Sequence, residues 1–173
     1  MPSPLSKAEF TSRFAAVYEA SPWVAEAVWP KVASGELEAA PDFALPALAQ
    51  AMREAVDAAP KAQQLALIRA HPELASRTRM AEASVREQSG AGLDQCSATE
   101  FAAFERLNGA YNARFGFPFI IAVKGLTRAE ILAAFEARLA AEPATEFATA
   151  IAQIHRIAGF RLAELLAPPM AQL

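Results

Sequence analysis

Apolar residues recur every three or four positions along most of the chain, which is the period of a helix with one buried face. The first such run begins with Phe10 and Phe14. It follows Ser6 and Glu9, which have the spacing of a capping box, where each side chain bonds the backbone N–H of the other residue. This pattern predicts a first helix that runs from the cap to about Ala20.

Serine, threonine and proline mark the remaining helix starts and stops. Ser21 followed by Pro22 has the composition of an N-cap and first helical position, and this predicts the next helix. Capping-box patterns recur at Ser97 with Glu100 and at Thr127 with Glu130. The expected helices span about 21–33, 45–58, 60–70, 84–91, 97–115, 127–141 and 143–167, and the last is ended by Pro168 and Pro169.

Residues 117–123 break this rhythm with Pro118 and a short β-branched run. They predict an extended segment without a sheet partner, whose backbone polar groups need partners from elsewhere. The fold expected from the whole pattern is all-α. We expect a single domain over residues 1–173, with about eight helices and one short extended segment near 117–124.

Composition narrows the functional classes. The 173 residues are 54% hydrophobic and carry a net charge of −3 without a basic block, so the positive stripe that nucleic acid requires is missing. The single cysteine, Cys96, cannot form an internal disulfide, and no Cys/His cluster offers four zinc ligands. No apolar run is long enough to span a membrane, and no signal peptide is recognisable, so we expect a cytoplasmic protein.

His71 is one of only two histidines, and it falls at the expected end of the helix 60–70, directly before Pro72. A helix C-terminus favours the protonated imidazole, which suits a proton donor. The alternative is that the ring only caps the last carbonyls of its helix. The other histidine, His155, is expected on the flank of the last helix, in a boundary or surface position.

Residues 84–88 read SVREQ. On a helix, Ser84, Glu87 and Gln88 share one face because of their i, i+3, i+4 spacing, so three polar side chains would point the same way. The alternative is a capping box, because Ser84 and Glu87 also have that spacing.

Arg161 lies within the apolar stripe of the last helix, between Ala158 and Leu165. A charge in that position is costly unless it is paired, so Arg161 should meet a carboxylate, a ligand anion or carbonyl groups. A structural ion pair with Glu87 or another acid is the alternative to a ligand contact.

An extended segment over residues 119–123 would expose backbone N–H and C=O groups in alternation. Such an edge can bind a flat ligand rich in amide groups, such as an oxidised purine. The alternative is a buried connector whose groups are satisfied by water or side chains.

Three motifs together resemble the OHCU decarboxylase family, where OHCU is 2-oxo-4-hydroxy-4-carboxy-5-ureidoimidazoline. They are HPELA at 71–75, SVREQ at 84–88 with AGLD at 91–94, and YNARFGFPFIIAVKG at 111–125. The resemblance continues to QIHRI at 153–157 and RL at 161–162. It implies an all-helical enzyme without a cofactor or metal, commonly dimeric, that completes the conversion of urate to (S)-allantoin.

The resemblance also implies the site. His71 matches the catalytic histidine, and Glu87 and Arg161 are expected to assist it. The expected substrate contacts are Pro72, Ser84, Val85, Arg86, Glu87, Gln88, Phe119, Ile120, Ile121, Ala122 and Val123. The implied partners are a small ureidoimidazoline substrate and a second copy of the chain, with no nucleic acid and no membrane. The alternatives are a helical ligand-binding protein without activity and an enzyme acting on a related ureide.

Overall fold

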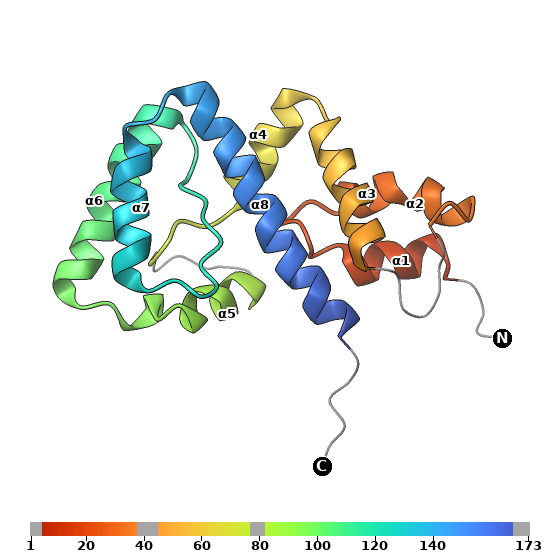
Figure 1. Ribbon diagram of the computed structural model, residues 1–173, viewed down its shortest axis with the longest axis horizontal. Coiled ribbons are helices and arrows are strands. Elements are labelled where there is room, and N and C mark those ends of the chain that lie inside the picture. The colour runs from red at the N-terminus through yellow and green to blue at the C-terminus, as the bar shows by residue number, and fades with distance from the viewer. Residues whose placement is uncertain (1–4, 38–44, 77–81, 168–173) are drawn as a thin grey trace, which may run out of the picture. The chain divides into compact units, whose positions relative to one another are not determined.

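The computed structural model describes residues 5–37, 45–76 and 82–167, so the expected helix stop at Pro168 and Pro169 lies outside the described residues. The chain divides into two compact units. The first contains Met1–Gln64 and His155–Leu173, and the second contains Leu65–Ile154. Every regular element in the described ranges is a helix (Figure 1), which confirms the expected all-α class.

The first unit contains α1 (Lys7–Phe14), α2 (Trp23–Ala33), α3 (Leu45–Asp57) and the C-terminal part of α8 (Pro143–Leu166). α1 packs on α2, and α2 packs on α3. The core of this unit is apolar, and its fully buried side chains include Phe10, Phe14, Leu48 and Met52.

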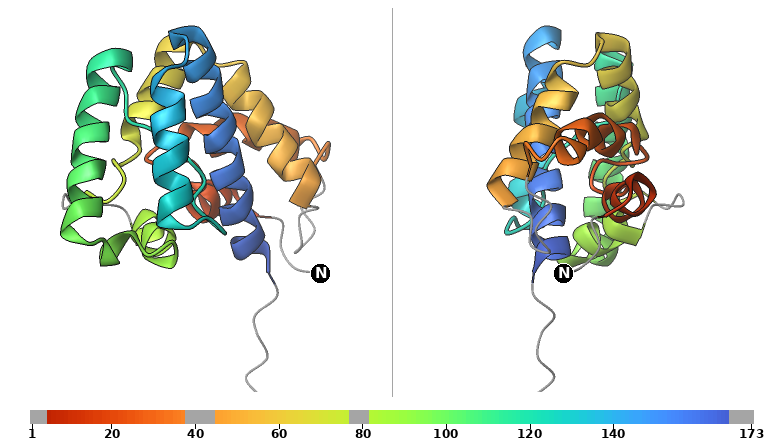
Figure 2. Two further views of the ribbon diagram at one scale, coloured as in Figure 1. Left: turned by 60° about the vertical axis from the view of Figure 1, so that its left-hand side comes forward. Right: turned by 90° about the vertical axis from the view of Figure 1, so that its right-hand side faces the viewer.

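The second unit contains most of α4 (Lys61–Ala70), then α5 (Glu82–Gly90), the short 3-10 helix η1 (Leu93–Gln95), α6 (Ala98–Phe115), α7 (Arg128–Leu139) and the start of α8. α6 and α7 lie side by side (Figures 1 and 2). Its core is aromatic, because the Tyr111 ring contacts Phe117, Phe119 and Phe135. Such ring contacts add to the stabilisation that burial alone provides.

Local signals placed most helix starts correctly. The capping boxes that begin at Ser6, Ser97 and Thr127 are all present with both reciprocal bonds. α6 ends where Gly116 adopts φ +73° and donates its N–H to the carbonyl of Asn112, a conformation that glycine reaches without strain. Residues 117–123 follow as a segment without helix or strand, as expected.

The boundary between the first two helices differs from expectation. α1 ends at Phe14 rather than near Ala20, which has a left-handed φ of +43°. Ser21 does not cap α2, because its hydroxyl donates to the carbonyl of Glu19 and Pro22 occupies the N-cap position. The turns over 15–21 carry side chains that bond to α8, and these distant contacts outweigh local helix propensity.

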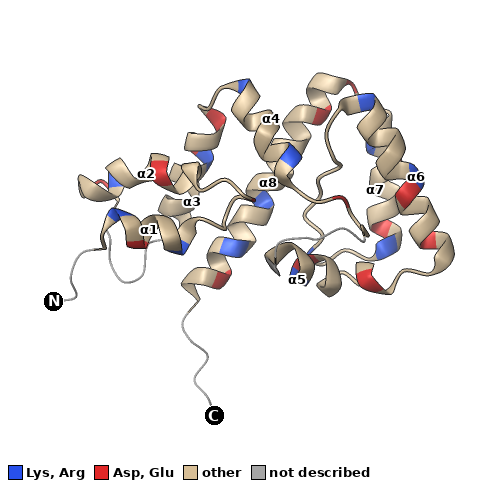
Figure 3. Cartoon of the chain, turned by 180° about the vertical axis from the view of Figure 1, so that it is seen from behind, with Lys and Arg blue, Asp and Glu red and all other residues tan. Residues whose placement is uncertain are grey.

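Charged residues of both signs are interspersed along the described helices (Figure 3). No helix in the described ranges is long and apolar enough to cross a membrane.

Candidate active site

His71 follows the last residue of α4, as its position before Pro72 predicted. The ring is buried, and its Nδ1 lies 3.0 Å from the carbonyl oxygen of Leu67. A carbonyl can only accept, so Nδ1 carries a hydrogen and Nε2 is the ring nitrogen that can gain or lose a proton. The contact that the capping alternative predicts is therefore present, and it also fixes the orientation of the imidazole.

The three residues after Pro72 are held by amide side chains from two helices. Gln88 of α5 accepts the N–H of Ala75 at 3.0 Å and donates to the carbonyl of Glu73 at 3.3 Å. Asn108 of α6 donates to the carbonyl of Leu74 at 3.0 Å. The backbone next to His71 is thereby fixed on both sides of Leu74.

Asn112 extends this support, because its amide donates to the Glu73 carboxylate at 2.6 Å. Neither asparagine was singled out from the sequence. Asn108 carried a usable signal, since it shares the buried face of α6 with Phe104, Leu107 and Tyr111. An amide on such a face needs hydrogen-bond partners, as Arg161 does on its own helix.

α5 presents the residues of the SVREQ motif on different faces. Ser84 and Gln88 are buried, Glu87 is half-buried, and Val85 and Arg86 are exposed. The shared face of Ser84 and Gln88 follows their spacing of four residues. Ser84 is the third residue of α5, so it cannot be its N-cap, and the capping-box alternative for this motif is wrong.

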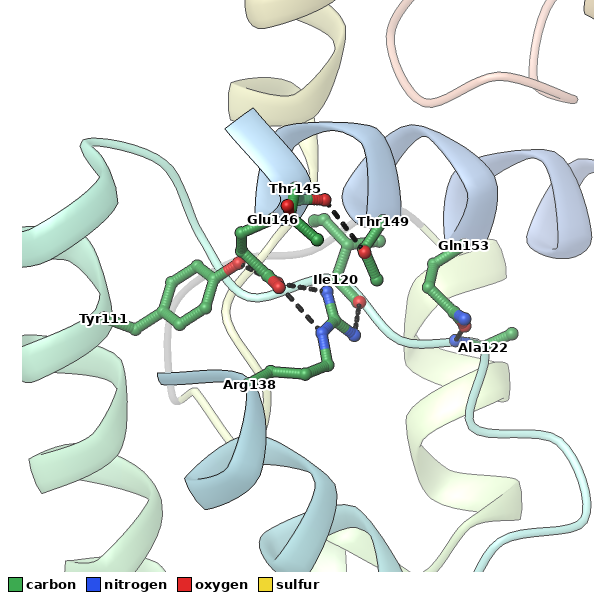
Figure 4. Close-up of polar contacts among 8 residues, drawn as sticks. All are labelled: Tyr111, Ile120, Ala122, Arg138, Thr145, Glu146, Thr149 and Gln153. Atoms are coloured by element: carbon green, nitrogen blue, oxygen red, sulfur yellow. Dashed lines mark hydrogen bonds and ion pairs between the residues drawn. The ribbon is translucent and has the colours of Figure 1, made fainter. Parts of the chain in front are cut away.

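The extended segment is also tied to the end of α4. Arg69 Nε donates to the carbonyl of Gly116 at 3.0 Å, directly before the segment begins. Within the segment, the carbonyl of Ile120 accepts from Arg138 at 2.7 Å and the N–H of Ala122 donates to Gln153 at 2.9 Å (Figure 4). The second unit thus contains His71, Pro72, the SVREQ motif and residues 119–123.

Arg161 belongs to the first unit, on α8. Its Nη2 lies 2.9 Å from the Glu19 carboxylate and its Nη1 lies 3.2 Å from the carbonyl of Ala16. Both charged side chains are buried. The acid that pairs with Arg161 is therefore Glu19, which the sequence did not single out because it is 142 positions away along the chain.

His155 was expected at a boundary or on the surface, and that expectation is wrong. The residue is buried, with Nδ1 2.9 Å from the Tyr18 hydroxyl and Nε2 3.0 Å from an Asp57 oxygen. Burial raises the pKa of Tyr18 and lowers the pKa of His155. A protonated Tyr18 thus donates to Nδ1 of a neutral imidazole, whose Nε2–H donates to Asp57.

The comparison with known proteins decides the family. A profile of OHCU decarboxylase matches residues 3–163, which include parts of both units. The chain belongs to the OHCU decarboxylase family. Within this family, the 2-oxo-4-hydroxy-4-carboxy-5-ureidoimidazoline decarboxylase of Haloferax volcanii is 43% identical over 155 residues, covering 90% of this chain and 88% of that protein.

Two larger proteins also match this chain. The uric acid degradation bifunctional protein PucL of Bacillus subtilis is 42% identical over 156 residues, which are 90% of this chain and 30% of that protein. A crystal structure of (S)-allantoin synthase aligns with TM-score 0.74 and 34% identity, covering 94% of this chain and 51% of that one. That structure confirms the fold.

Proposed function

We propose that this chain is a carboxy-lyase that decarboxylates 2-oxo-4-hydroxy-4-carboxy-5-ureidoimidazoline to (S)-allantoin. Membership of the OHCU decarboxylase family supports this reaction. Relatives named for uric acid degradation and for (S)-allantoin synthesis support placing the reaction at the end of urate oxidation. The observation that carries the proposal is the oriented, buried imidazole of His71, next to a backbone segment fixed by Gln88 and Asn108.

The reaction releases an electron pair that the substrate itself can hold. When the bond to the carboxylate breaks, CO2 leaves and the pair passes into the adjoining imine system of the ring. His71, protonated on Nε2, hydrogen-bonds the developing anion and then delivers that proton to one face of the carbon bearing the ureido group. The S configuration follows from delivery to one face, and solvent returns a proton to the neutral imidazole.

The other proposed residues bind or orient the substrate. Glu87 orients the imidazole or the substrate hydroxyl, and its half-buried position beside Gln88 supports contact with a polar ligand. Backbone groups of residues 119–123 bind the ring, and Pro72 with residues 84–88 contacts the ureido and hydroxyl groups. For Arg161, proposed to bind an oxygen that gains charge, the support is the family resemblance, because its own contacts are to Glu19 and Ala16.

We further propose that the two units form one functional domain, because the family profile runs through both. A cytoplasmic homodimer is the proposed state of the enzyme. Light scattering on the purified chain should then give a mass of about twice the 18.5 kDa monomer. A monomer mass at assay concentration would contradict the dimer.

The activity is tested by adding the chain to OHCU freshly generated from urate and recording circular dichroism and CO2 release together. Rapid appearance of the (S)-allantoin signal with stoichiometric CO2 is expected. If the slow, racemic background is unchanged by the protein, the decarboxylase proposal is wrong.

A further inference from the structure

The backbone of residues 119–123 is held by two side chains of the same unit (Figure 4). Arg138 of α7 donates from Nη1 to the carbonyl of Ile120, and Gln153 of α8 accepts the N–H of Ala122. Ile121 lies between these two anchored groups. Among the described residues, no hydrogen bond engages its own backbone N–H or C=O.

Arg138 is itself fixed by a buried acid. Its Nε and Nη2 lie 2.9 Å and 2.5 Å from Oε1 of Glu146, whose side chain is 1% exposed. The Tyr111 hydroxyl donates to the same oxygen, and burial raises the pKa of Tyr111, so the hydroxyl keeps its proton. The guanidinium also lies over the Phe119 ring at 4.3 Å. The planar guanidinium of Arg138 thus links Glu146 to both Phe119 and Ile120.

A buried ion pair contributes little net stability to a core. Removing two charges from water is unfavourable, and well-packed apolar side chains in their place often give a protein of equal stability. Phe119 already stacks on Phe135 with ring centroids 3.9 Å apart, so apolar contacts alone can bury its side chain. What the polar contacts add is direction, because they fix which backbone groups of the segment face which way.

We propose that Arg138 and Gln153 are positioning residues that fix the backbone on both sides of Ile121, so that its N–H and C=O are held in place as a donor and an acceptor for the flat amide groups of the ligand. Glu146 and Tyr111 act through Arg138. This inference rests on the proposed function and adds to it four residues that do not touch the substrate. Its consequence is that these residues control substrate affinity, while the proton transfer by His71 is left intact.

The test compares steady-state kinetics with OHCU, the Kd for (S)-allantoin and amide exchange at Ala122. Arg138→Lys keeps the charge but loses the planar guanidinium, and Gln153→Met keeps the length but loses the acceptor. Each is expected to raise KM and Kd about tenfold, the loss expected for one misaligned hydrogen bond, with kcat within about threefold. Gln153→Glu keeps an acceptor for the Ala122 N–H, so its KM and Kd should stay close to those of the wild-type protein. Gln153→Met lacks the acceptor and should exchange the Ala122 amide hydrogen faster.

Arg114→Lys is the matched control, because Arg114 also donates to a backbone carbonyl, that of Ala141, but outside the segment. It should leave KM, kcat and exchange at Ala122 unchanged. If the wild-type protein converts OHCU while both variants keep its KM and Kd, the positioning inference is wrong and the proposed function stands. The inference is also overturned if affinity falls only in parallel with thermal stability and Gln153→Glu has the same weakened affinity as Gln153→Met. A wild-type protein without activity overturns both proposals.

Discussion

The side chain of Gln88 holds Ala75 in a backbone conformation that alanine rarely adopts. Ala75 has φ +53°, and its N–H donates to Gln88 Oε1 at 3.0 Å. A left-handed conformation costs a residue with a Cβ about 1–2 kcal/mol, so the surrounding contacts must impose it. The residue lies four positions after His71, and the strain therefore belongs to the loop that follows the proposed proton donor.

Ala75→Gly should relieve this strain. Glycine adopts the left-handed conformation without a Cβ penalty, although its greater freedom in the unfolded chain offsets part of the gain. We expect the free energy of unfolding to rise by up to about 1 kcal/mol in urea denaturation. Ala133→Gly, at an exposed position inside α7, is the control and should lower it by about 0.5–1 kcal/mol. Equal losses in both variants would show that Ala75 is not strained.

Gln88→Met should uncouple α5 from the loop after His71. The Ala75 N–H and the Glu73 carbonyl would lose their partner, at a cost of about 1–3 kcal/mol in unfolding free energy. Activity should fall as well, because the amide positions the backbone beside His71, the proposed proton donor. Urea denaturation and OHCU turnover measure the two effects. Ser89→Ala, which removes only an exposed hydrogen bond to Asp94, is the control. Unchanged activity in a destabilised Gln88→Met protein would limit Gln88 to a structural role.

Stability should decline in mild acid because of His155. Burial lowers its pKa from the ordinary value of 6.5, which outweighs the opposing effect of Asp57. The folded state then binds a proton less readily than the unfolded state, so the stability from the neutral ring is complete above about pH 6.5 and is lost as pH falls below it. Urea denaturation between pH 7 and 5 should show the decline in wild-type and His71→Asn proteins. A His155→Asn protein with the same slope would assign it to other groups.

The buried pair of Arg161 and Glu19 allows structure and catalysis to be separated. Arg161→Met alone removes the guanidinium that faces a buried carboxylate and should cost about 3–5 kcal/mol of unfolding free energy. The double variant with Glu19→Leu should recover much of that loss, because both charges of this buried pair are then removed. If Arg161 also binds the substrate, the recovered protein stays inactive in the OHCU assay. Recovery of both stability and turnover would remove Arg161 from the proposed site.

Local signals predicted more of the helix pattern than of its contacts. Capping boxes at Ser6, Ser97 and Thr127 were found because all their bonds lie within four residues. The same spacing at Ser84 and Glu87 does not mark a helix start, because α5 begins two residues before Ser84. The early end of α1 was missed because its cause lies in α8, which the turn residues Tyr18 and Glu19 contact through His155 and Arg161.

Arg138 and Glu146, which support residues 119–123, carry the same sequence signal as Arg161: a charge on the apolar face of a helix. Arg138 lies three residues after buried Phe135 on α7, and Glu146 lies on the same face of α8 as buried Ala150 and Ile154. Both are charges on apolar stripes, so each needed a buried partner. That they pair with each other, and that Arg138 reaches Ile120, depends on packing between distant segments that spacing does not reveal.

The proposed role of His71 is to deliver the proton that sets the configuration of allantoin. It is tested most directly by following freshly generated OHCU by circular dichroism with wild-type protein and with His71→Asn, after checking that both are folded. The wild-type protein should produce (S)-allantoin rapidly, and His71→Asn should slow the reaction by about 10²–10⁴-fold, leaving mainly the racemic background product. Equal rates and the same S product from both proteins would contradict the account and assign the proton to another group.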